Sequence, residues 1–457
     1  MPQAENPGHV AKHNPEPLDV AIIGAGPAGL VAAYRLHGLG LSVKVFEALD
    51  HVGGRTRCAH IAGETVNTGA MFVYVGSESE AICRELEIPS VPVSPSTFGV
   101  SLGGKTVIAR EDAELLNALD LPSEASQQLA HVIKEVRKEY AAYMGKGGLT
   151  EESKQLSKVS LSQHLGPLHP LVDGIVSNGV KGGSTADPGS LSAQYALRYF
   201  ASYLVRAKGH RVYLPDGMQE MSNRLAARLD AETVQLNTAV GSVKETSASG
   251  YELVVLSQAG PQRVVAKQVI FAVPGPGVVE LAPWLPDWKL DAIERISTNP
   301  TVTLAIVLDS KDQTQWDDIF FVVTVDAAFN MVLQPRSAAD VVPSSRGTTC
   351  FYCYLSADAR AAAQGDDEAM KAAWLEDFYR VIPNSRGRVI DSILTRWERC
   401  FAPPAPARDD ALGDVRASLG GLHFAGDYTS DTAGSHGAFV EGNRVARAVL
   451  ETLEKRS

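Results

Sequence analysis

The stretch that decides the fold is LDVAIIGAGPAGLVAAYRLHGLGLSVKVFEA, residues 18–48. Its apolar start predicts a buried parallel strand, its middle a helix and its end a second strand. Gly24, Gly26 and Gly29 have the spacing GxGxxG. The first glycine allows a tight turn, the second lets the backbone approach a pyrophosphate, and the third lets the helix pack on the strand. The stretch therefore predicts a dinucleotide-binding unit.

Two further features of this unit concern the phosphates and the ribose of the dinucleotide. Pro27 and Ala28 open the helix, whose free N–H groups and positive dipole end would point at the phosphates. Glu47 ends the second strand, just before Ala48, where its carboxylate can accept hydrogen bonds from both ribose hydroxyls of an adenosine. A lone GxGxxG would suit a purely structural turn equally well. The strand, the helix and the acid together favour the cofactor.

A second glycine pair follows in HVGGRTR, residues 51–57. NAD-dependent dehydrogenases do not need it, whereas in FAD proteins a second turn at Gly54 and the guanidinium of Arg55 can clamp the outer side of the pyrophosphate. Residues 69–72, in ETVNTGAMFVYVG, suit a chain that passes close beneath an isoalloxazine ring. These residues are Gly69, Ala70, Met71 and Phe72. FAD is therefore the predicted cofactor.

These motifs, with three more along the chain, resemble the flavin-containing amine oxidase superfamily. That superfamily includes monoamine and polyamine oxidases, protoporphyrinogen oxidase and phytoene-type desaturases. The matching segments are IIGAGPAGL, FEALDHVGGRTR, LNTAVGSV, VIFAVPGPGVVELAPWLP, and FAGDY with EGNRVARAVL. They stand in the family order and span nearly the whole chain, which is far more specific than any one motif.

The resemblance gives a role to the glycine-rich end of the chain, which in this family returns to the first domain. It implies that Gly426 and Asp427 meet the ribityl–pyrophosphate part of FAD, with Asp427 accepting a hydroxyl. The helix start near Phe439 and Val440 would offer N–H groups and a positive dipole end to the flavin N1/O2 edge. Because that edge gains negative charge on reduction, such a helix favours hydride acceptance.

The resemblance also implies the fold and its division into domains. The expected fold is α/β, with a Rossmann-like FAD-binding domain of the GR2 or amine-oxidase type and a discontinuous α+β substrate domain built on an antiparallel sheet. The FAD-binding domain would comprise residues 17–95, 205–280 and 395–457, and the substrate domain residues 96–204 and 281–394. Residues 1–16 are polar and contain several prolines, which predicts a flexible N-terminal arm. The sequence has no second GxGxxG unit, so no internal NAD(P)H domain is expected.

Alternating runs such as TVTLAIVLDS and TTCFYCYLSA predict strands of the substrate domain, and EDAELLNALD through EYAAYM predicts amphipathic helix. Cys350 and Cys353 form a CxxC in one of these strands. Residues three apart on a strand point to opposite faces, so a buried structural pair is expected rather than a redox or metal site, and no metal is predicted. Five scattered cysteines do not predict a disulfide framework.

Three more positions match the family's cofactor surroundings. Val240, in LNTAV, corresponds to a backbone contact to adenine, and Trp397 to a tryptophan that flanks the flavin ring. Many amine oxidases of the family hold a lysine through a water at flavin N5, and an ungapped count puts Thr303 at or beside that position. Its alternative interpretation is an ordinary strand residue. Cys400 is too close to Trp397 for the cysteine that attaches flavin in monoamine oxidases, so non-covalent FAD is predicted.

Two residues near the last helix are further candidates for the chemistry. Phe439 aligns with one of the two aromatic walls by which amine oxidases steer an amine before the flavin. His436 could relay a proton, although a histidine at such a place is more often an ordinary residue of a surface turn. The aromatic stripe of Tyr195, Tyr199 and Tyr203 on one helix face is more typical of a core than of a substrate cage.

Composition restricts the class of partner. The formal charge of −11 argues against nucleic acid, and no stretch is apolar enough to span a membrane. Met1–Pro17 does not have the pattern of a signal peptide, so a cytoplasmic location is expected. The expected partners are a small-molecule substrate and, as a candidate electron acceptor, O2. The sequence gives no indication of the oligomeric state.

The function that these features predict is an FAD-dependent oxidoreductase. It would take a hydride from a small or medium, largely apolar substrate, at an amine C–N bond or at a C–C bond, and pass it to flavin N5. Two alternatives stay open. A flavin-dependent double-bond isomerase or desaturase acting on an unsaturated lipid would not need the missing lysine. A binding role without catalysis fits less well, because the sequence contains both a pyrophosphate clamp and a flavin-edge helix.

Overall fold

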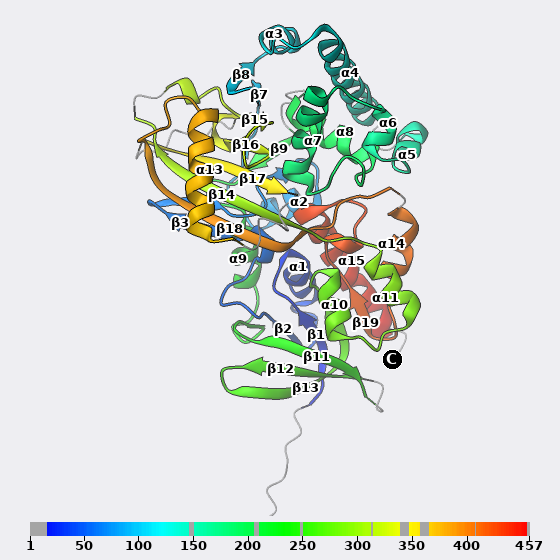
Figure 1. The fold of residues 1–457 in the computed structure, drawn as a ribbon. Coiled ribbons are helices and arrows are strands. Elements are labelled where there is room, and N and C mark those ends of the chain that lie inside the picture. Colours follow the sequence, from blue (N-terminus) through cyan, green and yellow to red (C-terminus); the bar gives the residue numbers. More distant parts are fainter. Residues whose placement is uncertain are drawn as a thin grey trace, which may run out of the picture.

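The computed structural model describes residues 16–145, 150–204, 210–246, 250–311, 314–338, 347–356, 365–406 and 408–454. All but the last residue of the predicted N-terminal arm, residues 1–16, lies outside this part of the chain. Two seven-stranded sheets organise the molecule, and Figure 1 shows one below the other, with helices gathered around each.

The first sheet has the strand order β10-β2-β1-β13-β12-β11, with β19 beside β13. Strands β10, β2, β1, β13 and β19 pair in parallel, while β11, β12 and β13 form an antiparallel meander. The long strand β13 belongs to both parts, because its last six residues pair with β1. The bounds are β1 (Leu18–Ile23), β2 (Val43–Phe46), β10 (Val234–Gln235), β11 (Ala239–Glu245), β12 (Tyr251–Ser257), β13 (Gly260–Phe271) and β19 (Leu422–Phe424).

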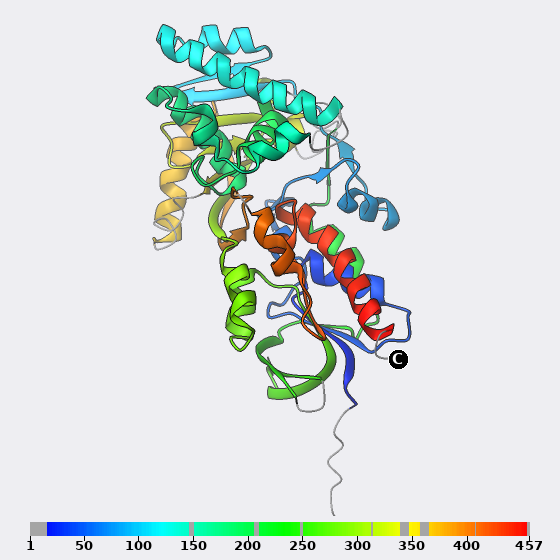
Figure 2. The ribbon, with the colours of Figure 1, turned by 90° about the vertical axis from the view of Figure 1, so that its right-hand side faces the viewer.

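The predicted strand–helix–strand unit is β1, α1 (Pro27–Leu36) and β2. The last helix, α15 (Gly434–Glu454), packs along α1, and Figure 2 shows the red helix α15 beside the blue helix α1. Gly442 permits this approach, since an added Cβ would lie 2.7 Å from the carbonyl oxygen of Ala28. The other helices of this half are α2 (Glu78–Glu85), α9 (Gln219–Ala227), α10 (Gly275–Leu281), α11 (Asp287–Glu294) and α14 (Asp409–Arg416).

The second sheet has the order β18-β14-β17-β16-β15-β7-β8. Its pairings are antiparallel except for one: β15 runs parallel to β7. The expectation of an antiparallel sheet is thus right for every pairing but this one. The bounds are β7 (Phe98–Leu102), β8 (Lys105–Ala109), β14 (Asn299–Asp309), β15 (Phe321–Thr324), β16 (Met331–Leu333), β17 (Thr348–Ser356) and β18 (Val389–Phe401).

Helices cover both faces of the second sheet. One face packs against helices that include α4, α7 and α8, and the other against α13. Cys350 lies in the first of these cores and Cys353 in the second, as the strand period predicts, and both are free thiols. The helices are α3 (Asp112–Ala118), α4 (Ser123–Gly145), α5 (Glu151–Leu156), α6 (Leu161–Leu165), α7 (Pro170–Ser184), α8 (Ala193–Leu204) and α13 (Asp367–Val381).

A small three-stranded sheet joins the two halves. It consists of β5 (Val73–Tyr74), β9 (Arg211–Tyr213) and β6 (Val91–Pro92), and a separate hairpin is formed by β3 (Cys58–Ile61) and β4 (Glu64–Asn67). Val212 packs in the core of the first half and Tyr213 in the core of the second. The strands of the first sheet all fall within the three segments expected to bind FAD, although the domain boundaries themselves stay a prediction.

Candidate active site

The first glycine turn has the geometry that its spacing predicts. Gly24 has φ +100°, and an added Cβ would lie 2.8 Å from the carbonyl oxygen of Ala272. At Gly29 a Cβ would lie 2.0 Å from the carbonyl oxygen of Gly24, so the helix packs directly on the turn. At Gly26, by contrast, the position of a Cβ is open space. The turn therefore leaves room at the one glycine that was expected to face a pyrophosphate.

Glu47 lies beside this turn. It directly follows β2, is 9% exposed, and is followed by the half-exposed residues that leave the sheet. Its carboxylate accepts hydrogen bonds from the backbone N–H of Ala25 at 2.8 Å and of Leu49 at 3.0 Å. The acid is thus fixed to the glycine turn just before α1. A ribose next to the pyrophosphate would lie at this place. Ala48 continues the chain away from the sheet.

The second glycine turn faces the first. Gly53 and Gly54 have φ +111° and +49°, and a Cβ on Gly54 would lie 3.5 Å from the Cα of Gly26. The N–H of Gly53 donates to the carbonyl of Ala25 at 2.9 Å, which holds the two turns together. A side chain at Gly54 would therefore point at Gly26 and narrow the space between the turns. This side-chain-free cradle at a helix N-terminus fits a pyrophosphate.

Arg55 and Asp427 contact each other, which the sequence did not predict. Two parallel N–H···O bonds of 2.9 and 3.0 Å join the guanidinium to the carboxylate, and Arg55 also donates to the carbonyl of Cys400 at 2.7 Å. Desolvation alone would lower the pKa of Arg55, but the charge of Asp427 outweighs it and raises that pKa. Asp427, only 1% exposed, follows Gly426 at the end of β19. The ion pair therefore ties the second turn to the end of the chain.

Residues 69–72 pass directly beneath the second turn. A Cβ on Gly69 would lie 2.2 Å from the carbonyl oxygen of Arg55, and the N–H of Ala70 donates to that carbonyl. Met71 is buried, and the ring of Phe72 lies 6.3 Å from that of Phe320 in the second half. The segment thus runs from the cofactor cradle to the interior of the other half.

Thr303 and Trp397 converge on one backbone atom, the carbonyl oxygen of Thr68. The hydroxyl of Thr303, on β14, donates to it at 2.8 Å, and the indole N–H of Trp397, on β18, donates at 2.7 Å. Thr303 and Trp397, both predicted as site residues from the sequence, are 94 positions apart and yet meet beside Gly69. Thr68 itself was missed, because a backbone acceptor leaves no signal in the sequence.

Phe439 does not fit the predicted aromatic wall. It is 0% exposed and belongs to the core around α1, because the helical period puts it on the same side as the buried Ala446. Its side chain is thus packed inside the first half rather than presented to a substrate. The contacts expected of the backbone at Phe439 and Val440, and at Val240 on β11, stay predictions.

His436 lies in the first turn of α15, beside Tyr74 and Ser79. Its Nδ1 is 3.4 Å from the Ser79 hydroxyl oxygen, and its ring centroid is 5.9 Å from that of Tyr74. Desolvation lowers the pKa of His436, with Asp431 opposing. The structure therefore places His436 in a part-buried position at the junction and not on an open surface turn.

Aromatic side chains gather at the same junction. Tyr74 is 40% exposed, and desolvation raises the pKa of its hydroxyl to about 12. Tyr199 and Tyr203 of α8 are buried with their hydroxyl oxygens 3.3 Å apart, while Tyr195 one turn earlier is half-buried. The tyrosine stripe is thus core at one end and half-buried at the other.

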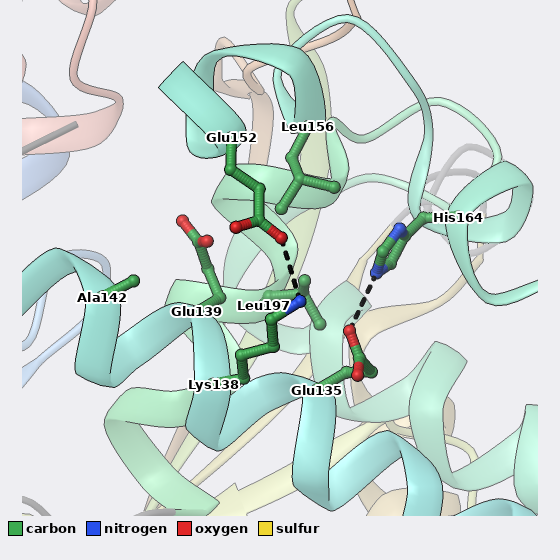
Figure 3. Close-up of a pocket in the computed structure, with 8 residues that line it drawn as sticks. All are labelled: Glu135, Lys138, Glu139, Ala142, Glu152, Leu156, His164 and Leu197. Carbon is green, nitrogen blue, oxygen red and sulfur yellow. Dashed lines mark hydrogen bonds and ion pairs between the residues drawn. The ribbon is translucent and has the colours of Figure 1, made fainter. Parts of the chain in front are cut away.

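A separate small pocket lies among α4, α5, α6 and α8 (Figure 3). Its lining includes the ion pairs Lys138–Glu152 at 2.9 Å and His164–Glu135 at 3.6 Å. The volume of ≈ 20 Å³ is enough for a water molecule or two but not for an organic substrate. None of the residues that line it belongs to the glycine turns or to the aromatic side chains of the junction.

The fold and the cradle define a flavin-binding oxidoreductase, and comparisons with known proteins agree. The sequence matches the family of flavin-containing amine oxidoreductases over residues 27–450, and the chain belongs to this family. The expected fold class and the assignment as an oxidoreductase enzyme are thereby confirmed.

Particular relatives cover almost the entire chain. Polyamine oxidase 1 of Oryza sativa subsp. japonica is 24% identical over 520 residues, which cover 94% of this chain and 97% of that protein. The structure of putrescine oxidase bound to putrescine has a TM-score of 0.74 at 22% identity, covering 95% and 99% of the two chains. Cyclohexylamine oxidase from Brevibacterium oxydans IH-35A has a TM-score of 0.75 at 19% identity, covering 96% and 100%.

The described residues also bear on two other kinds of site. Within the ranges given above, no three or more His, Cys, Asp or Glu side chains are grouped so that they could hold a metal ion. Over the same ranges, none of the helices has both the length and the apolar character needed to cross a membrane.

Proposed function

We propose that this protein oxidises an amine at its C–N bond with non-covalently bound FAD. The half built on the first sheet would hold the FAD, and the half built on the second sheet would form the substrate site. The observation that carries the proposal is the side-chain-free cradle formed by the two glycine turns, against which residues 69–72 pack. Polyamine, putrescine and cyclohexylamine oxidases are named for amine substrates, and this favours amine oxidation over double-bond isomerisation.

Each side of the cradle would have its own role. Glu47 would accept the ribose hydroxyls, the turns at Gly26 and Gly54 would hold the pyrophosphate, and Asp427, already bound to Arg55, would accept a ribityl hydroxyl. When bound, FAD supplies a two-electron acceptor that takes a hydride at N5. The N-terminal turn of α15 would favour the charge that develops on reduction.

His436 is the candidate proton acceptor on the substrate side. An amine gives up a hydride from its α carbon only when its nitrogen is neutral, because the nitrogen lone pair must stabilise the developing positive charge. The lowered pKa keeps the His436 imidazole neutral at pH 7, so it can accept the proton that the ammonium loses. The substrate leaves as an imine, which water hydrolyses to a carbonyl compound and an amine or ammonia.

The surroundings of Cys400 support non-covalent attachment. Desolvation raises the pKa of its thiol to about 11, and the thiolate is the form that reacts. The backbone carbonyl of Cys400 also accepts a hydrogen bond from Arg55. A thiol held in this protonated state beside an ion pair is a poor nucleophile toward a flavin.

The test is anaerobic mixing of the FAD-loaded protein with a panel of amines, amino acids and unsaturated lipids. Bleaching of the flavin absorbance by an amine or an amino acid is expected, with one equivalent of carbonyl product. Turnover of an unsaturated lipid without bleaching or net redox change would contradict the proposal and favour an isomerase. Admission of air then separates an oxidase, which recovers its colour with stoichiometric peroxide, from a dehydrogenase, which stays bleached.

A further inference from the structure

Arg211 lies at the centre of the junction, buried among aromatic rings. It is the first residue of β9, is 2% exposed, and pairs in register with Tyr74 of β5. Its guanidinium carbon is 4.6 Å from the ring centroid of Tyr203, 4.8 Å from that of Phe72 and 5.6 Å from that of Phe320. Three ring faces therefore surround the charged group.

No carboxylate neutralises this cation within the described residues. Its Nη2 donates to the backbone carbonyl of Ser202 at 2.6 Å, and its buried Nη1 has no hydrogen-bond partner among the residues that the structure describes. Less buried arginines of the same chain do have such a partner: Arg55 pairs with Asp427, Arg198 with Glu139 and Arg336 with Glu64. A buried charge without a counter-ion is costly, because neither water nor an anion compensates for its lost hydration.

The position of Arg211 relates this unpaired charge to the aromatic side chains of the junction. Val73 and Val212 point into the core of the first half, so Tyr74 and Arg211, which alternate with them, point to the opposite side. On that side lie Tyr203 and Phe72, and Phe72 ends the segment expected beneath the flavin ring. An anion bound to Nη1 would therefore lie on the substrate side of the cofactor.

We propose that Arg211 binds the carboxylate of the substrate, and that the substrate is an amino acid with an apolar or aromatic side chain. This inference rests on the proposed function, amine oxidation, and names its substrate class. A guanidinium is the cation best suited to a carboxylate, and the rings of Tyr74 and Tyr203 suit an apolar side chain. A diamine such as putrescine would place a second ammonium near the Arg211 cation, and like-charge repulsion would weaken its binding.

The first test uses benzoate, a carboxylate that cannot be oxidised at a C–N bond. Benzoate binding to the FAD-loaded protein is followed by titration calorimetry and by the shift of the flavin absorbance. The expected result is that Arg211→Met weakens binding about 10- to 100-fold, the effect of losing charge-assisted hydrogen bonds, and that Arg211→Lys retains part of it. Arg198→Met, which removes an ion-paired arginine of the same half, is the matched control and should bind as the wild type does.

The second test compares phenylalanine with phenethylamine, which differ only in the carboxylate, by anaerobic flavin bleaching. Faster bleaching by phenylalanine, reversed in Arg211→Met, is expected. Bleaching by phenethylamine alone, with benzoate affinity unchanged in Arg211→Met, would overturn this inference and leave amine oxidation standing. Bleaching by neither, with benzoate still bound through Arg211, would instead count against the proposed function. Far-UV circular dichroism of Arg211→Met and Arg211→Lys verifies that both variants fold.

Discussion

The carboxylate of Glu47 illustrates how one residue couples the glycine turn to the cofactor. It already accepts two backbone N–H bonds, from Ala25 and Leu49, without any ligand. The acid is therefore preorganised, and ribose hydroxyls would be added to a carboxylate that has lone pairs to spare.

We predict that Glu47→Ala weakens FAD binding by roughly 1–3 kcal/mol, the usual effect of removing a charged acceptor from buried donors. Titration of the apoprotein with FAD, followed by quenching of flavin fluorescence, measures it. Glu47→Gln is the matched variant, which keeps acceptor oxygen and volume and should lose less. Equal affinity of the wild type and Glu47→Ala would show that this carboxylate does not contact the cofactor.

Thr303 is expected to affect how fast the reduced flavin reacts with O2. A fixed cation near flavin N5 would stabilise the superoxide-like charge that forms when O2 takes its first electron, and the hydroxyl of Thr303 donates instead to the carbonyl of Thr68. We therefore predict slow reoxidation of the reduced wild type in stopped-flow mixing with aerated buffer, and faster reoxidation in Thr303→Lys. The Thr68 carbonyl keeps its bond from Trp397 in that variant.

Thr303→Val is the control, since it removes the hydroxyl without adding charge and should reoxidise as slowly as the wild type. Fast reoxidation of the wild type that Thr303→Lys leaves unchanged would mean that this position does not set the oxygen reactivity.

Among the secondary-structure elements, some glycines of the turn are needed for packing and others are expected to be needed only for cofactor binding. The sequence predicted the strand–turn–helix unit and its role because GxGxxG has a definite steric meaning at each position. It also predicted the opposite faces of Cys350 and Cys353, because the period of a strand is fixed. It misplaced Phe439, since on a helix that packs against a partner helix only the tertiary contact decides which face is buried.

A matched pair of variants tests this separation. In Gly29→Ala the added methyl would lie 2.0 Å from the Gly24 carbonyl oxygen, so we predict loss of stability even without FAD. In Gly26→Ala the methyl enters open space, so the apoprotein should be as stable as the wild type while FAD affinity falls. Thermal unfolding of the apoproteins and FAD titration measure the two effects. A Gly26→Ala protein that binds FAD normally would contradict the pyrophosphate position.

A buried lysine caps helix α14. Lys289 is 0% exposed, and its Nζ donates to the carbonyls of Asp414, Val415 and Ala417 at 2.7–2.8 Å. We predict that Lys289→Met destabilises the protein by roughly 2–5 kcal/mol in urea unfolding, because three carbonyls at a helix end lose their donor. Unchanged stability would mean that water replaces the ammonium.

The same lysine predicts a pH dependence. Desolvation lowers the pKa of Lys289 from 10.5 to about 7. Between these values the unfolded chain binds more protons than the folded one, so this group makes stability rise with pH from about 7 to about 10. The free-energy difference between the wild type and Lys289→Met should therefore widen over that window. A difference that is flat with pH would contradict the shift.

In the whole molecule, the site is assembled from segments that lie far apart in the sequence. The cradle combines residues near 25, 54 and 427, and the junction combines β5, β9 and α8. Family motifs predicted the first of these groups, because each carries glycines or an acid with a recognisable spacing. Arg211 and Tyr74 could not be predicted, since a lone arginine in a short strand has the same appearance in sequence whether it is exposed or buried.

In our proposal, the glycine turns near the start of the chain and the segment around Asp427 near its end form one non-covalent FAD site. Its most direct test is the visible spectrum of the purified protein, after addition of FAD and removal of the excess, before and after acid precipitation. We predict a flavin spectrum with one FAD per chain, and we expect acid to release all of this FAD into the supernatant. A folded protein that retains no FAD would contradict the site itself, and flavin that stays in the precipitate would contradict its non-covalent attachment.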